Sequence, residues 1–463
     1  MPMLRENTNK KFYFLLGLIV LIPNLVTSAF VELSYDEAYY WLYSENLAWG
    51  YFDHPPLVAL MIKFGTLILG KTELGVRLFA NILMTIAGVL MWKMTERKNV
   101  YSFFLLFLTM PLVQFSGIFS LPDSVMVLTS VFYFWFLKKF IEDKSIINSI
   151  ALAVSIALMF YAKYHGLLIV LLTVFGNLKF LKEKRFWLVA GLVVVFYLPH
   201  MYWQYMHDFV SFKFHLFGRK EKHFSFSNIT NYVTGQIALM GVFNFFLITW
   251  ALKKNAVKNL FEKILVWNSF GFFIFLFLLS FRNQIEANWT VSCSIALIIL
   301  MTDRVSKYPK RLVLCSSFSL VLILVLRAGI FFAEDFSHDP MDNENRLNEI
   351  ARWKNERIPE ILKICNGQKM VAENYQYAAK VSFYTDQIVP GLHLDSRTSQ
   401  FGIWNFEKNI KPEEPVCLLT TKNILGAYRI ETFFKDPVFV IPSTSLSNIA
   451  KVYNTTYEEM ITH

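Results

Sequence analysis

Acidic and basic side chains that could carry chemistry gather between Ser34 and Pro56, directly after the first hydrophobic stretch of the chain. Asp36 and Glu37 stand near the start of this segment, and Asp53 and His54 stand near its end. Ionisable groups at a bilayer are costly unless they are paired or hydrated. A carboxylate held there can accept a proton from a reacting hydroxyl group. We therefore expect the reactive site in this segment.

The two adjacent acids also fit an ordinary structural role. Ser34 and Glu37 match a capping box, in which each side chain bonds the backbone N–H of the other residue. Asp36 would then be a favourable charge at a helix N-terminus. The short interfacial helix that follows would keep Asp36 and Tyr40 on its wet side, so Asp36 stays available for chemistry.

The end of the segment is expected to form a rigid corner. Consecutive prolines after His54 forbid a helix and favour an extended backbone, and a rigid mount beside the Asp53 carboxylate suits a functional group. The alternative is a plain loop in which His54 is only solvated. Sequence alone leaves both interpretations open.

Further charges follow hydrophobic stretches elsewhere in the chain. Asp123 comes after Pro122, where it could also cap a helix. Lys163 lies between apolar stretches and is expected to reach a lipid headgroup or a buried anion. The loop 204–231 adds basic residues on a side of the membrane where they are scarce, which indicates an anionic ligand. These residues are Lys213, Arg219, Lys220 and Lys222.

Composition shows which elements must position these residues. The 463 residues are 55% hydrophobic and only 17% charged, with 46 phenylalanines, which excludes an ordinary water-soluble domain. Apolar runs of membrane-spanning length recur along the chain, and we predict a mainly α polytopic helix bundle of about eleven spans. The spans are expected near residues 12–30, 75–95, 101–118, 122–137, 146–160, 164–179, 186–203, 231–252, 261–280, 287–302 and 311–332.

Charge in the loops predicts the orientation of the bundle. Alternate loops are rich in Lys and Arg, and such loops are cytoplasmic by the positive-inside rule. The N-terminus falls on the same side and its first span is expected to be retained as an anchor. Residues 1–332 are thus predicted to form the transmembrane catalytic domain, and residues 333–463 are predicted to form a smaller α/β domain outside the cytoplasm. Interfacial helices are expected in the first outside loop.

The predicted outside domain holds Cys365 and Cys417, which could pair in an oxidising compartment. Its Arg397 and Trp404 could select an acceptor or could only pack between domains. The chain has no metal-binding Cys or His spacing and no Walker or Rossmann glycine pattern. The basic residues are spread over many loops, which argues against nucleic acid as a partner.

Glycosyl transfer from a lipid-linked sugar would use all of these features. The polyprenyl chain would lie among apolar spans, cations would stabilise the departing phosphate, and an aspartate would accept the proton of the acceptor hydroxyl. No nucleotide is needed outside the cell for such a reaction.

Several motifs also resemble those of the GT-C membrane glycosyltransferases of the protein O-mannosyltransferase and lipid A aminoarabinose transferase type. The resemblance rests on DEAYYW and YFDHPPL in the first outside loop, on LPD at Leu121, on AKYHG at Ala162 and on EANW near residue 286. It extends to PHMYWQYMHDFVSFKFHLFGR and to YQYAAKVSFYT and DSRTSQFGIW in the C-terminal region.

The resemblance implies a role for each matched residue. Asp36 would be the catalytic base or a ligand of the acceptor hydroxyl, with Glu37 as its neighbour and Asp123 as the second acidic group of the catalytic site. Asp53 and Tyr40 would support the site. The donor phosphate would be bound by His54, Lys163, Arg219 and Lys220. His54 departs from the pattern, because the aminoarabinose transferases carry lysine at that corner, which puts its phosphate role and an identical donor in doubt.

These observations predict an inverting transferase that uses a polyprenyl-phosphate sugar, of the undecaprenyl-phosphate type, in the bacterial inner membrane. The acceptor would be a hydroxyl or phosphate of lipid A, of lipopolysaccharide core or of a protein. No cofactor or metal site is predicted, and assistance by a divalent cation is left open. The alternatives are a transporter or lipid flippase, against which the absence of repeated broken spans argues, and a non-catalytic assembly subunit.

Overall fold

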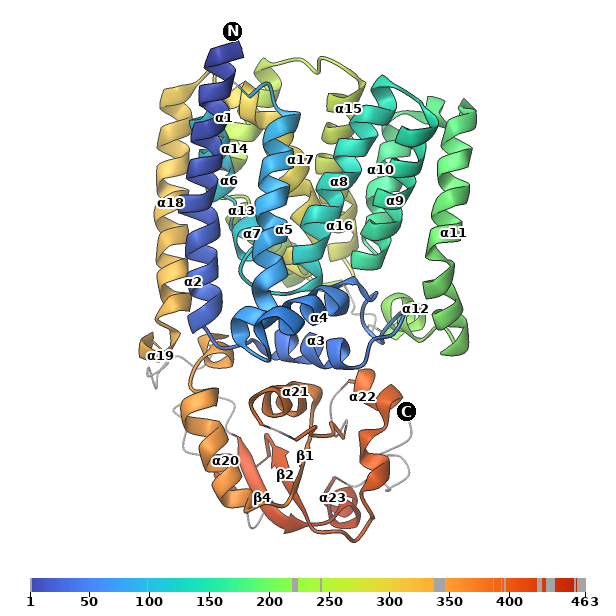
Figure 1. Cartoon of the computed structure of the whole chain (residues 1–463), viewed down its shortest axis with the longest axis vertical. Coiled ribbons are helices and arrows are strands. Elements are labelled where there is room, and N and C mark those ends of the chain that lie inside the picture. Colours follow the sequence, from blue (N-terminus) through green and yellow to red (C-terminus); the bar gives the residue numbers. More distant parts are fainter. Residues whose placement is uncertain are drawn as a thin grey trace.

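The computed structural model describes residues 2–97, 99–218, 224–241, 244–336, 346–385, 387–392, 394, 397–422, 427–429, 438–453 and 455. Helices form a bundle, and a smaller part that contains the sheet lies beyond one end of it (Figure 1). Helix α1 begins at the opposite end. The prediction of a mainly α membrane bundle with a small α/β part is confirmed.

Among the described residues, six helical segments are long and apolar enough to cross a membrane. The first, Asn7–Phe30, runs through α1 (Pro2–Leu16), η1 (Gly17–Leu21) and α2 (Ile22–Phe30). Four others are single helices: α5 (Glu73–Met94), α8 (Pro122–Glu142), α11 (Lys184–Met206) and α18 (Pro309–Phe331). The remaining segment, Leu260–Ser280, runs through α15 (Leu260–Val266), η4 (Trp267–Gly271) and α16 (Phe272–Ser280). The chain is therefore a multi-pass membrane protein.

The other five expected spans contain shorter helices of the same bundle. They are α6 (Val100–Leu108) with α7 (Pro111–Phe115), α9 (Ile146–Ala162), α10 (Gly166–Gly176), the pair α13 (Phe226–Leu239) and α14 (Asn244–Lys254), and α17 (Val291–Val305). The pair α13 and α14 is bent by 80°, and it makes a seventh span if it is counted as one. Helix α17 is buried over nearly its whole length, as expected for a central helix. The count of eleven stays a prediction.

Two helices of the segment that follows the first span lie between the bundle and the C-terminal part (Figure 1). They are α3 (Tyr35–Glu45) and α4 (Leu57–Leu69), and the chain between them carries the proline corner. The predicted capping box is present, because Ser34 Oγ accepts the backbone N–H of Glu37 and the Glu37 carboxylate accepts the backbone N–H of Ser34. This cap fixes the start of α3.

The C-terminal part is a four-stranded sheet with short helices. The strands are β1 (Lys369–Ala372), β2 (Val416–Thr420), β3 (Tyr428–Arg429) and β4 (Phe439–Thr444). Their order is β1-β2-β4-β3, with β1 and β2 parallel and the other pairs antiparallel. The helices include α19 (Ala333–Phe336), α20 (Ile358–Cys365), α21 (Tyr375–Tyr384), α22 (Gln400–Trp404) and α23 (Leu446–Val452). The short helix α12 (Val210–Lys213) belongs instead to the loop after α11. A disulfide joins Cys365 to Cys417.

Candidate active site

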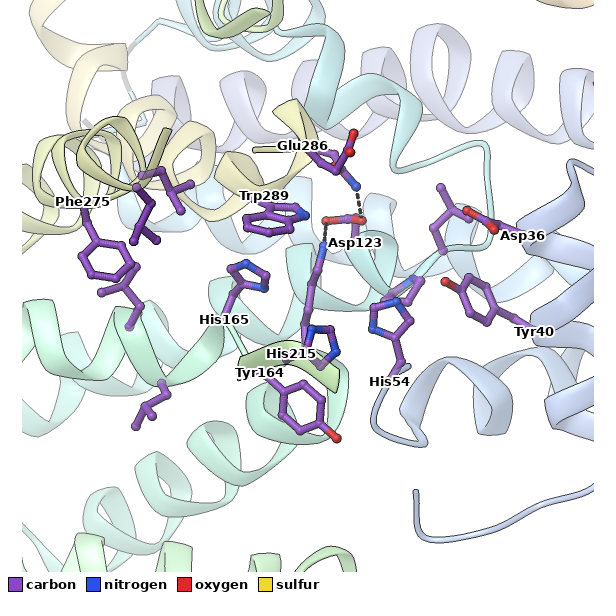
Figure 2. Close-up of a pocket in the computed structure, with 18 of the residues that line it drawn as sticks. Asp36, Tyr40, His54, Asp123, Tyr164, His165, His215, Phe275, Glu286 and Trp289 are labelled. Carbon is purple, nitrogen blue, oxygen red and sulfur yellow. Dashed lines mark hydrogen bonds and ion pairs between the residues drawn. The ribbon is translucent and has the colours of Figure 1, made fainter. Parts of the chain in front are cut away.

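A cavity of about 520 Å³ lies at the end of the bundle that faces the C-terminal part. One end of the cavity is polar and holds Asp36 and Tyr40, whereas Phe275 marks the far end (Figure 2). Most of the apolar lining comes from α10 and α16, which contribute Leu167, Leu168, Leu171, Phe275, Leu276 and Leu279. A cavity with one charged and one aliphatic end fits a ligand with a polar head and a hydrocarbon tail.

Asp36 lines the polar end of the cavity from the first turn of α3. Its side chain is accessible from the cavity, although protein atoms crowd it on other sides. This partial desolvation, together with nearby Glu349, Asp53 and Glu37, raises the pKa of Asp36 to about 6, and Arg397 acts in the opposite direction. Asp36 is therefore a stronger base than an ordinary aspartate and is still mostly ionised at neutral pH.

Glu37 points away from the cavity, contrary to the expectation that it is a catalytic group. Its two carboxylate oxygens each lie 2.7 Å from a nitrogen of Arg77, and both side chains are fully buried. The carboxylate also accepts the backbone N–H groups of Ser120 and Ser34. All these bonds favour the charged form. Glu37 therefore holds α3 against α5, and we assign it a positioning role instead of contact with the reaction.

Asp123 and Lys163 form a buried ion pair in the wall of the cavity. Lys163 Nζ lies 2.8 Å from Asp123 Oδ1, and the Asn288 side chain donates to Asp123 Oδ2 at 2.9 Å (Figure 2). The side chains of Lys163 and Asp123 are only 6% and 8% exposed. Leu121 is the N-cap of α8, so the alternative of Asp123 as the helix cap is wrong. The anion that Lys163 was expected to reach is Asp123.

Three histidines surround this ion pair: His54, His165 and His215 (Figure 2). Burial, reinforced by the positive charge of Lys163 and by neighbouring histidines and Arg397, lowers the pKa of His54 well below 6.5, so His54 is neutral at pH 7. Among the described residues, the buried Nδ1 atom of His54 has no hydrogen-bond partner. A neutral imidazole at this corner can donate or accept one hydrogen bond to a ligand, but it adds no positive charge.

Asp53 lies behind the cavity wall and binds a residue of the C-terminal part. Its Oδ1 atom is 2.5 Å from Arg397, and Tyr43 donates to its Oδ2 atom at 3.2 Å. Arg397 and Tyr375 both line the cavity. The C-terminal part therefore supplies a section of the wall, next to Asp36.

Two expected phosphate ligands, Arg219 and Lys220, lie outside the described residues. Lys163 is thus the expected cation that the structure places in the cavity. Among the residues that the structure describes, no cluster of three or more His, Cys, Asp or Glu side chains is arranged to hold a metal ion.

Sequence reasoning missed several residues of this site. His165 and Asn288 stand inside the motifs AKYHG and EANW but were not singled out, and His215 was passed over among the basic residues of its loop. Arg397 is separated from Asp53 by 344 positions. Spacing along a helix or loop does not predict a contact between residues this far apart in the sequence, so no local signal could have identified the pair.

Comparisons with known proteins agree with this architecture. Residues 53–203 match the model of a family described as dolichyl-phosphate-mannose-protein mannosyltransferase. The chain is 23% identical over 338 residues to the lipid A galacturonosyltransferase RgtD of Rhizobium johnstonii (strain DSM 114642 / LMG 32736 / 3841). The matched region covers 69% of this chain and 70% of RgtD.

Solved structures with a similar fold include ArnT from Cupriavidus metallidurans in two states. The apo structure has a TM-score of 0.63 at 13% identity and covers 93% of this chain and 98% of ArnT. The structure bound to undecaprenyl phosphate has a TM-score of 0.62 at 12% identity, covering 92% and 97%. At this level of identity the likeness establishes a shared fold over almost the whole chain.

Proposed function

We propose that this chain is a GT-C membrane glycosyltransferase of the protein O-mannosyltransferase and aminoarabinose transferase type, and that it transfers a sugar from a polyprenyl phosphate to a hydroxyl group of lipid A. The observation that carries the proposal is the two-ended cavity, in which an accessible aspartate lies at one end and an aliphatic surface at the other. The named substrates of RgtD and of the ligand-bound ArnT structure support this choice of acceptor and donor.

The donor would lie along the length of the cavity. Its isoprenoid chain would pack on the leucines of α10 and α16, where apolar burial is favourable. Its phosphate would lie near Lys163, and its sugar would point toward Asp36. The neutral His54 would give the phosphate a hydrogen bond but no charge.

The transfer would then be a single displacement with inversion at the anomeric carbon. Asp36 accepts the proton of the acceptor hydroxyl as its oxygen forms the new bond to the anomeric carbon. The bond from that carbon to the phosphate oxygen breaks, and its electron pair stays on the polyprenyl phosphate. Lys163 stabilises the negative charge that develops there. Asp123 and Asn288 hold the Lys163 ammonium in place.

The catalytic face is proposed to lie outside the cytoplasm, in the periplasm of a bacterium. The basic loops at the opposite end of the bundle support this orientation, and the Cys365–Cys417 disulfide suits an oxidising compartment. In this orientation residues 1–332 form the membrane catalytic domain and residues 333–463 the periplasmic domain. A periplasmic reporter fused after Phe336 should be active, and an inactive reporter would contradict the orientation.

Mass spectrometry of envelope glycolipids and glycoproteins tests the activity. Cells that lack the gene should lose one sugar from lipid A, and cells that carry Asp36→Asn should show the same loss. Asp143→Asn, which changes an exposed acid outside the cavity, is the matched control and should restore the sugar. Unchanged glycans on deletion would refute a transferase. A lipid of normal mass that accumulates on the wrong side of the membrane would instead indicate a flippase.

A further inference from the structure

Arg397 is held at the cavity by three segments that are distant in sequence. Its guanidinium pairs with Asp53 of the first outside loop at 2.5 Å and donates to the Tyr375 hydroxyl at 3.2 Å. It also lies 4.8 Å from the centre of the Tyr375 ring and 5.3 Å from that of Phe214, which belongs to the loop after α11. An arginine with this many contacts has a defined position.

The backbone next to Arg397 is anchored on the same outside loop. The Gln400 side chain accepts the backbone N–H of Phe52 at 2.7 Å, and the backbone N–H of Gln400 donates to the Tyr39 hydroxyl at 2.7 Å. Helix α21, which carries Tyr375, packs against α3, which carries Asp36 and Tyr39. The distance from the positive charge to Asp36 is therefore set by the packing of the C-terminal part on α3.

Asp36 has more negative than positive neighbours at this end of the cavity. Glu349, Asp53 and Glu37 all disfavour its ionised form, whereas Arg397 favours it. The hydroxyls of Tyr40, on the same helix, and of Tyr375 complete the polar surroundings. Glu37 is neutralised by Arg77, and within the described part of the chain Arg397 is the cation that pairs with Asp53. Loss of Arg397 would remove a cation and also expose Asp36 to the charge of Asp53.

From this geometry we infer that Arg397 is a positioning residue through which the C-terminal part keeps Asp36 ionised for proton transfer. Its importance for the reaction rests on the proposed role of Asp36 as the base. The C-terminal part then contributes to catalysis itself, in addition to any role in binding the acceptor.

Titration of the Asp36 side chain tests the inference without any substrate. Infrared spectroscopy of the full-length protein in detergent follows the carboxylic acid C=O band, and the component missing in Asp36→Asn is the Asp36 signal. Wild-type protein should titrate with a midpoint near 6. Arg397→Gln should move the midpoint up by roughly 1 pH unit or more, because an adjacent cation lowers an aspartate pKa by about that much.

Two further variants separate charge from structure. Arg397→Lys keeps the charge and should leave the midpoint within about 0.5 pH unit of wild type. Lys354→Gln removes another contact between the C-terminal part and the bundle, the 3.2 Å pair with Glu73, and should leave the midpoint unchanged. An unmoved midpoint in folded Arg397→Gln, or an equal upward shift in Arg397→Lys, would overturn the inference.

The pH dependence of transfer gives a second readout. Activity of Arg397→Gln relative to wild type should fall as the pH is lowered and should rise by roughly fivefold from pH 6 to pH 8, as expected for a base whose pKa has risen by about 1 unit. A purely structural defect would lower activity equally at all pH values. If the infrared midpoint moves but neither protein transfers a sugar, the proposed function fails while the link between Arg397 and Asp36 stands.

Discussion

Replacing each of the adjacent acids Asp36 and Glu37 should have opposite consequences. Glu37→Gln should destabilise the protein by about 3–5 kcal/mol, because it leaves the buried Arg77 guanidinium without its counter-charge. Two short bonds to Arg77 and two to backbone N–H groups are affected. Asp36→Asn should leave the free energy of unfolding unchanged or slightly higher, because the fold disfavours the charged form of Asp36, and it should abolish transfer.

The sign of the pH dependence also differs between the two acids. Burial alone would raise the pKa of Glu37, but the Arg77 charge and the hydrogen bonds outweigh it and lower the pKa. The stabilisation from Glu37 is therefore complete above about pH 4.5 and is lost as the pH falls below that value. The pKa of Asp36 is raised instead, from 3.8 to about 6, so stability falls as the pH rises through this interval and the cost is complete above pH 6.

Thermal unfolding of the purified protein in detergent measures the first effect, and sugar transfer to lipid measures the second. The double variant Glu37→Gln/Arg77→Met removes both charges and should recover much of the stability that Glu37→Gln loses. A Glu37→Gln protein as stable as wild type would refute the positioning role of this ion pair. Full activity in folded Asp36→Asn would refute the assignment of the base.

Three other predictions concern the cavity and the C-terminal part. Lys163→Met should lower the rate of sugar transfer by at least about 100-fold. It should also cost roughly 3 kcal/mol of stability, because it leaves the Asp123 charge buried alone. Adding Asp123→Asn to this variant should restore the melting temperature but not the transfer. Cys365→Ser should lower the stability of the C-terminal part by about 4 kcal/mol, because the bond to Cys417 closes a loop with a sequence separation of 52. The protease resistance of the wild-type protein and of the variant, with and without reductant, measures this loss. His54→Gln should reduce the loss of thermal stability between pH 7 and pH 5, because neutral His54 must be protonated on unfolding there, and an undiminished loss would contradict its neutral state.

Much of the fold follows from patterns within short stretches of sequence. Apolar runs of bilayer length predict the long helices, and Ser34 with Glu37 predicts the start of α3 and its cap. The change in composition near residue 333 predicts a C-terminal part of a different kind. These signals are local, so a single sequence is enough to read them.

The pairing of charges could not be read in the same way. Spacing suggested that Asp36 and Glu37 act together, whereas the structure gives Glu37 to Arg77, 40 positions away. Lys163 was expected to bind an anion, but its partner Asp123 lies on another helix. Arg397 could be assigned to packing or to the site with equal reason. Helix packing determines which charged side chains form ion pairs, and no local sequence pattern encodes that packing.

Reconstitution with the lipids of cells that lack the gene shows whether the protein moves a sugar from polyprenyl phosphate to a glycolipid. Purified protein in vesicles of that lipid extract should add one sugar residue to a glycolipid and release polyprenyl phosphate in equal amount, both measured by mass spectrometry. Asp36→Asn should do neither. Sugar transfer by Asp36→Asn at the wild-type rate, or addition of the sugar without release of polyprenyl phosphate, would contradict the account.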